Sequence, residues 1–164
     1  MKLELVENPP PLTGAVTPRL HTPWVEGESK VDVIIKLAEL IGQPLLEWQI
    51  VILRDMCAVD NKDQFVKKSS LLVCSRQSGK SHVLRMRVLA GLFYFGEMNI
   101  LIMSSQMLMA SKSLEIMAGI IDRNEFLRSQ VKGGNIEKAY KRTNGNNRII
   151  LESGAEVRVV AATA

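Results

Sequence analysis

Residues 71–81 read LLVCSRQSGKS, and the rest of the chain is interpreted outward from this stretch. The apolar run at 71–75 is typical of a short buried strand. Residues 76–81 predict a tight loop, and the apolar-periodic segment 83–95 predicts a helix. Backbone N–H groups at such a junction of strand, loop and helix form a concave site for anions, which the helix dipole reinforces.

The Gly-Lys-Ser triplet at 79–81 matches the end of the phosphate-binding loop, or P-loop, G-x-x-x-x-G-K-[ST]. In that motif Lys80 reaches the β- and γ-phosphates of a nucleotide, and the Ser81 hydroxyl binds Mg²⁺. Cys74 stands where the pattern requires its first glycine. The alternative is an ordinary helix N-terminus, capped by Ser78, with Lys80 in solvent. The strand before and the helix after favour nucleotide binding.

Length and composition indicate one soluble globular domain, since the chain has 164 residues, of which 46% are hydrophobic and 23% charged. The net charge of +4 is compatible with nucleic acid and equally typical of an ordinary solvated surface. Cys57 and Cys74 have no metal-ligand spacing and form no disulfide framework, which favours a reduced intracellular protein. No apolar run reaches about 18 residues, so we expect no membrane span.

The chain divides into a proline-rich arm, residues 1–28, and a domain, residues 29–164. The arm has no sustained hydrophobic period and should be extended or disordered. A helical stripe begins at Ser29 and ends at Gly42, and a second helix follows Pro44.

Residues 99–104 predict a second buried strand, and a helix is expected to begin near Met109. Residues 148–152 and 156–160 flank Ser-Gly-Ala and predict a C-terminal β-hairpin. The alternation of strands and helices favours an α/β fold with a parallel sheet flanked by helices.

Three polar features are candidate contacts for ligands. Trp48 and Gln49 lie about thirty residues before Lys80, and a side-chain amide can offer a donor and an acceptor to adenine. The alternative places Gln49 on a helix surface and Trp48 in the core. Residues 104–106, at the end of a predicted strand, could contact a DNA backbone or cap a helix. A basic cluster precedes the predicted hairpin and consists of Lys138, Lys141, Arg142 and Arg148. The simplest interpretation is a solvated surface, and the more specific alternative is a surface that contacts a phosphate backbone.

These motifs together resemble the N-terminal ATPase domain of the large terminase subunit, the motor that packages DNA into tailed-phage heads. The resemblance covers roughly residues 44–164, in the order of a Trp-Gln helix, CSRQSGKS, NILIMSSQMLMASK and a hairpin ending VRVVAATA. That family tolerates loss of the first glycine and favours S-R-Q-x-G-K-[ST], so Cys74 fits it. The resemblance implies a P-loop NTPase fold of the ASCE type.

The same resemblance implies the site and its cofactors, ATP and Mg²⁺. Gln49 would contact adenine, and Ser81 would be the metal ligand. Arg76 and Lys80 would be catalytic, because a cation near the γ-phosphate neutralises charge that develops in the transition state. The implied nucleotide-binding residues are Trp48, Gln49, Arg76, Gln77, Ser78, Gly79, Lys80 and Ser81.

For the whole protein, the resemblance implies ATP hydrolysis coupled to translocation of double-stranded DNA into the procapsid. The implied partners are DNA, the portal protein and the small terminase subunit. The implied assembly is a homo-oligomeric ring in the cytoplasm of the bacterial host, without membrane attachment.

The resemblance also implies that this ATPase domain is incomplete. The family's Walker B strand with its Asp-Glu pair, and its nuclease domain, would follow the hairpin; Glu152 lies at the predicted hairpin tip and is not a substitute. We therefore expect weak nucleotide binding without turnover. Later strands would lie between segments 71–75 and 99–104, so both should have unpaired edges. The alternatives are a helicase-like P-loop ATPase and a short non-enzymatic protein that binds nucleic acid or a partner.

Overall fold

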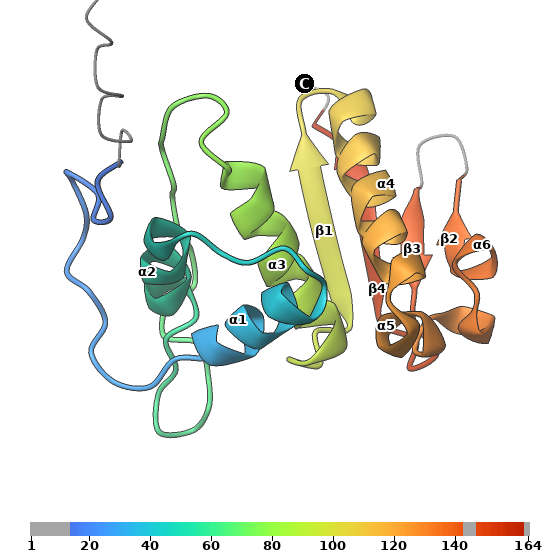
Figure 1. The fold of residues 1–164 in the computed structure, drawn as a ribbon, viewed down its shortest axis with the longest axis horizontal. Coiled ribbons are helices and arrows are strands. Elements are labelled where there is room, and N and C mark those ends of the chain that lie inside the picture. Colours follow the sequence, from blue (N-terminus) through green and yellow to red (C-terminus); the bar gives the residue numbers. More distant parts are fainter. Residues whose placement is uncertain (1–13, 143–146, 163–164) are drawn as a thin grey trace, which may run out of the picture.

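The computed structural model describes residues 14–142 and 147–162, which form an α/β fold (Figure 1). The helices are α1 (Val31–Leu40), α2 (Glu47–Met56), α3 (Lys80–Phe93), α4 (Met107–Arg123), α5 (Glu125–Ser129), the 3-10 turn η1 (Lys132–Gly134) and α6 (Ile136–Ala139). The strands are β1 (Asn99–Ser104), β2 (Tyr140–Lys141), β3 (Arg148–Ile150) and β4 (Glu156–Ala161).

The sheet is mixed, with the order β1-β4-β3-β2. β1 and β4 are parallel along their whole length, from Asn99 opposite Glu156 to Ser104 opposite Ala161. β3 pairs antiparallel with both β4 and β2. The predicted hairpin is confirmed, and it also explains why the sheet is only partly parallel. A turn of a few residues can join antiparallel neighbours, whereas a parallel pair needs a long crossover.

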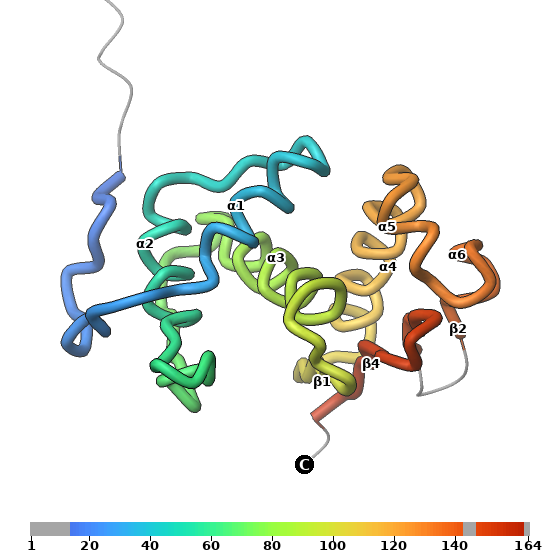
Figure 2. Tube along the Cα trace, turned by 90° about the horizontal axis from the view of Figure 1, so that it is seen from below, coloured from blue at the N-terminus to red at the C-terminus, as the bar shows by residue number. Residues whose placement is uncertain are grey.

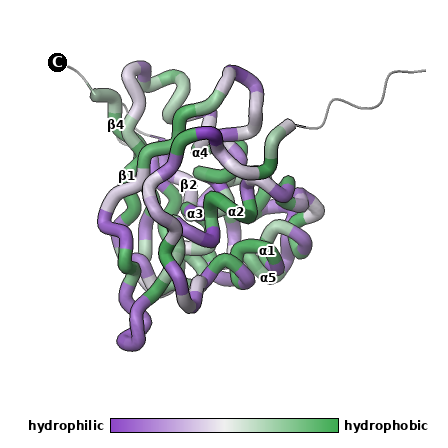
Figure 3. Tube along the Cα trace, turned by 90° about the vertical axis from the view of Figure 1, so that its left-hand side faces the viewer, coloured by the Kyte–Doolittle hydropathy of each residue, from purple (hydrophilic) through white to green (hydrophobic). Residues whose placement is uncertain are grey.

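Helices α3 and α4 lie on one side of β1 and β4 (Figure 2). Strand residues that face them, among them Ile102, Val157 and Val159, are buried. On the opposite face Leu101 is 48% exposed and Met103 is 61% exposed. This alternation follows from the two-residue repeat of a strand. Figure 3 shows hydrophobic residues along the helices and hydrophilic residues in many of the connecting loops.

Both N-terminal helices are confirmed. The residues of the expected stripe differ in burial: Ile34 and Leu37 are buried, Leu40 is 50% exposed, and Val33 and Ile41 are half-buried. The described part of the arm, residues 14–28, contains no helix or strand. It is held to α2 where the Val25 N–H donates to Asp55 Oδ1 at 3.0 Å. Residues 1–13 of the predicted arm lie outside the described residues.

The prediction of a buried strand at 71–75 is wrong. This segment belongs to no strand, and its apolar residues Leu71 and Val73 are 90% and 82% exposed. Leu72 is the residue of this stretch that packs against the core. The physical reason is the absence of a partner: within residues 14–142 and 147–162, no strand pairs with this segment. Without a ladder the backbone groups of an apolar run stay open to solvent.

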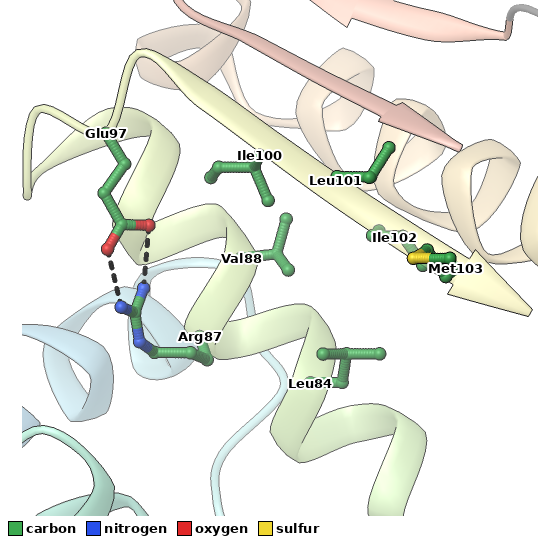
Figure 4. Close-up of a pocket in the computed structure, with 8 residues that line it drawn as sticks. All are labelled: Leu84, Arg87, Val88, Glu97, Ile100, Leu101, Ile102 and Met103. Atoms are coloured by element: carbon green, nitrogen blue, oxygen red, sulfur yellow. Dashed lines mark hydrogen bonds and ion pairs between the residues drawn. The ribbon is translucent and has the colours of Figure 1, made fainter. Parts of the chain in front are cut away.

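Among the described residues, no strand pairs with the edge of β1 that faces away from β4, because β1 ends the sheet. A groove of about 350 Å³ lies between this strand and α3 (Figure 4). Leu84 and Val88 of α3 line one side, and residues 100–103 of β1 line the other. Among the described residues, β1 therefore has one unpaired edge and segment 71–75 has no strand partner. None of the residues lining the groove belongs to loop 76–81.

An ion pair closes one end of this groove. The Arg87 guanidinium forms two parallel hydrogen bonds with the Glu97 carboxylate, at 3.0 and 2.6 Å (Figure 4). It also lies 4.9 Å from the ring centre of Phe65 and 5.3 Å from that of Phe95. Burial raises the pKa of the neighbouring Cys57 thiol to about 11. The pair thus joins α3 to the start of β1 and to the connector before loop 76–81.

Replacing Glu97 with glutamine should lower the free energy of unfolding by about 1–3 kcal/mol, because it removes a charge-assisted, bidentate contact from a largely buried guanidinium. Urea unfolding measures the change. The matched control is Glu115→Gln, which alters the exposed pair of Glu115 and Arg142, 3.7 Å apart. That change should cost about 0.5 kcal/mol or less. Equal costs for both variants would show that the Arg87 pair contributes no more than a surface ion pair.

Candidate functional site

The loop at residues 76–81 joins the extended segment 71–75 to α3, which begins at Lys80. In Figure 1 it lies at the end of the molecule where β1 and β4 have their carboxyl ends. Gln77 has φ +61° and Gly79, the residue that precedes the helix, has φ +96°. Left-handed residues in a tight turn redirect successive N–H groups and form anion-binding concavities.

The backbone N–H groups of residues 79–81 donate to no other backbone group within the part of the chain that the structure describes, whereas residues 76–77 form a turn that brings the Ser78 N–H toward the Ser75 carbonyl. The carbonyl of Gly79, in contrast, accepts from His82 N at 3.0 Å and from Val83 N at 3.3 Å, and so completes the first turn of α3. A run of unpaired N–H groups at the positive end of a 14-residue helix favours an anion. A phosphate group therefore fits this loop.

Lys80 folds over the loop. Its Nζ donates to the carbonyl oxygen of Cys74 at 2.7 Å and to that of Ser75 at 2.5 Å. The Ser78 hydroxyl also donates to the Ser75 carbonyl, at 2.8 Å, and lies 3.0 Å from Cys74 Sγ. Ser78 does not cap α3, so this part of the alternative is wrong. Lys80 is half-buried and bonded to the loop, and the cysteine at the first glycine position packs against the loop. An ordinary helix N-terminus that binds no nucleotide stays an open alternative.

Three other predicted residues of the loop are exposed. Arg76 and Gln77 are exposed, and Ser81 is exposed in the first turn of α3. Their side chains are free of the core, so each can approach a ligand at the loop. The roles expected for them, charge stabilisation by Arg76 and metal binding by Ser81, stay predictions.

Trp48 and Gln49 lie beside the loop although thirty residues separate Gln49 from Gly79. Gln49 Nε2 donates to the Gly79 carbonyl at 3.3 Å. The Gln49 side chain is 2% exposed, so the alternative of a helix-surface residue is wrong. Trp48 is half-buried, and its ring lies 3.8 Å from where a Cβ on Gly79 would stand. The sequence placed these residues at the site but gave no signal for the bond between Gln49 and the loop.

The basic cluster before the hairpin is partly neutralised. Arg148 pairs with Glu156 at 3.1 Å, and Arg142 lies 3.7 Å from Glu115. The two lysines of the cluster are exposed. These contacts favour a solvated face over a phosphate footprint. At the end of β1, the Ser104 hydroxyl accepts from Gln106 N at 3.4 Å, but no side chain caps α4, so the expected helix cap is wrong.

Within residues 14–142 and 147–162, no three His, Cys, Asp or Glu side chains come together as metal ligands. In the same residues, no helix has the length and apolar character needed to cross a membrane. Comparisons with models of protein families, with curated proteins and with solved structures find no match to this chain. The geometry around loop 76–81 therefore carries the functional proposal.

Proposed function

We propose that this chain binds ATP through residues 76–81, as the N-terminal ATPase part of a viral DNA-packaging motor of the large-terminase type. The observation that carries the proposal is the run of unpaired N–H groups at the start of α3, with Lys80 folded over it. This arrangement offers hydrogen bonds and positive charge to a triphosphate. The segment SRQSGKS, at 75–81, supports the family.

The residues present fit the proposed cofactors. The N–H groups of the loop would hold phosphate oxygens, and Lys80 would exchange its two carbonyl partners for the β- and γ-phosphates. Ser81, in the first turn of α3, would supply a hydroxyl to Mg²⁺. The metal ion supplies charge neutralisation at the phosphates. Arg76, exposed at the loop, would add positive charge near the terminal phosphate.

The finer fold assignment, a P-loop NTPase of the ASCE type, is part of the same proposal. It is supported by the parallel pairing of β1 with β4 and by a loop placed at the carboxyl ends of these strands. The partners are proposed through the resemblance alone: double-stranded DNA, the portal protein, the small terminase subunit and further copies of the chain in a ring. The proposed compartment is the cytoplasm of a bacterial host.

Replacing Lys80 with alanine should weaken ATP binding about 10- to 100-fold, because it removes charge-assisted hydrogen bonds to phosphate. Isothermal titration calorimetry with Mg²⁺ and ATP measures the dissociation constant. The matched control is Lys36→Ala, an exposed residue of α1, which lowers the net charge equally. Wild-type affinity in both variants would contradict the proposal.

A DNA-binding measurement separates this function from a non-enzymatic one. Salt-sensitive binding of DNA that needs no ATP and is unchanged by Lys80→Ala would favour a short binding protein. Binding that responds to ATP and is lost with Lys80 would favour the motor.

A further inference from the structure

Among the described residues, Gln49 is the one polar residue that is buried, and it is 2% exposed. It lies in the first turn of α2, and both ends of its amide are bonded within the protein. Oε1 accepts from the Leu46 N–H at 2.9 Å, and Nε2 donates to the Gly79 carbonyl at 3.3 Å. The side chain is therefore a bridge between the start of α2 and the start of α3.

The acceptor of this bridge is a peptide group of the phosphate loop itself. The peptide bond between Gly79 and Lys80 is planar and trans, so its carbonyl and its N–H point in opposite directions. A Gln49 amide that holds the Gly79 carbonyl toward α2 consequently directs the Lys80 N–H away from α2. That N–H is one of the unpaired groups offered to an anion. The Gly79 carbonyl also accepts from the N–H groups of His82 and Val83 in α3, so the bond from Gln49 is a third contact that ties this peptide group, with its Lys80 N–H, to α2.

The surroundings leave this amide little freedom. A Cβ added to Gly79 would lie 2.7 Å from Gln49 Nε2, so the loop and the amide are already in close contact. The Trp48 ring lies against the same position, at 3.8 Å. Because Gln49 is 2% exposed, a contact with a nucleotide base would require its side chain to leave the buried site, and its hydrogen bonds to Leu46 and Gly79 would then be lost. Breaking such bonds costs free energy when their partners are left buried and unpaired.

We propose that Gln49 is a positioning residue for the phosphate loop. Gln49 thereby affects the binding of the triphosphate and does not contact the base. The inference rests on the proposed binding of a nucleotide at residues 76–81 and deepens it. If Gln49 has this role, α2 is part of the phosphate site. The contribution of Gln49 to nucleotide affinity is then the same for every base.

The test replaces Gln49 with leucine, which has a similar size and neither donor nor acceptor. Dissociation constants are measured by calorimetry for ATP, GTP and inorganic tripolyphosphate, with the whole chain and Mg²⁺. All three should weaken by the same factor, about 3- to 10-fold, which is the loss of one neutral hydrogen bond. Weaker ATP binding with unchanged tripolyphosphate binding would assign Gln49 to the base and overturn the inference. Unchanged affinity for all three ligands would overturn it too.

A second measurement needs no ligand. In the nucleotide-free protein, hydrogen exchange of residues 78–83 should become faster in Gln49→Leu while exchange in α4 is unchanged. Uniformly faster exchange would show a general loss of stability and overturn the inference. Gln64→Leu, an exposed residue of the connector, is the matched control and should leave exchange and affinity unchanged. If the wild-type chain binds none of the three ligands, the proposed function fails, and exchange still decides whether Gln49 holds the loop.

Discussion

Replacing Gly79 with alanine is expected to weaken the binding of ATP and of tripolyphosphate about tenfold or more. Two causes act together at this residue. Its φ of +96° lies in the left-handed region, where a side chain costs about 1–2 kcal/mol. The new Cβ would also stand 2.7 Å from Gln49 Nε2, so the amide or the loop must move. Either movement changes the direction of the N–H groups that are proposed to bind phosphate.

The control separates loop geometry from backbone strain as such. Gly134 has a φ of +59°, and nothing lies within 4 Å of the position of an added Cβ. Gly134→Ala should therefore cost stability in a similar way and leave ligand binding at the wild-type value. Calorimetry measures affinity, and urea unfolding measures stability for both variants. Wild-type affinity in Gly79→Ala would mean that the described conformation of residues 76–81 is not the one that binds phosphate.

The sequence predicted local elements well wherever a hydrophobic period and an end signal agreed. α1, α3, β1 and the hairpin of β3 and β4 all occur where expected. For β1 an apolar run begins after Gly96 and Glu97 and ends at two serines, and its partner β4 alternates buried and exposed side chains. These signals are local, so a single sequence carries them.

Pairing between distant segments could not be read in the same way. Residues 71–75 have the composition of a strand, yet Leu71 and Val73 are exposed because the described residues provide no partner for them. A strand is a property of two segments, and composition describes only one. Similarly, β1 pairs with β4 across some fifty residues. The alternation of strands and helices predicted a parallel sheet but not that these two strands would be neighbours.

The sequence and the resemblance named the residues of the candidate site but not the contacts between them. The order Trp-Gln and Gly-Lys-Ser identified α2 and the loop as neighbours through a resemblance. The bonds of Gln49 to Leu46 and Gly79, and those of Lys80 to two carbonyls, depend on side-chain rotamers and burial. Such contacts are settled by packing, which a motif does not encode. The resemblance implies a base contact for Gln49, whereas these hydrogen bonds are the reason that we propose a positioning role.

Replacing Leu114 with alanine is expected to lower the free energy of unfolding by about 2–5 kcal/mol. Leu114 lies in the middle of α4 and is 0% exposed. α4 packs against β1, β3 and β4, so a cavity here affects the pairing of the whole sheet. The loss combines the free energy of transferring the removed atoms to water with the cost of the cavity, which the sheet cannot fill by relaxing. The midpoint of urea unfolding, at an unchanged slope, measures it.

Leu108 on the same helix provides the matched control. It is 76% exposed, so Leu108→Ala makes the same chemical change without opening a cavity and should alter stability by about 0.5 kcal/mol or less. The difference between the two variants isolates burial, since both remove the same atoms from one helix. A cost below about 1 kcal/mol at Leu114 would mean that α4 does not cover the sheet as described. Because the loop begins a neighbouring helix, α3, the Leu114 variant should bind ATP normally at temperatures where it stays folded.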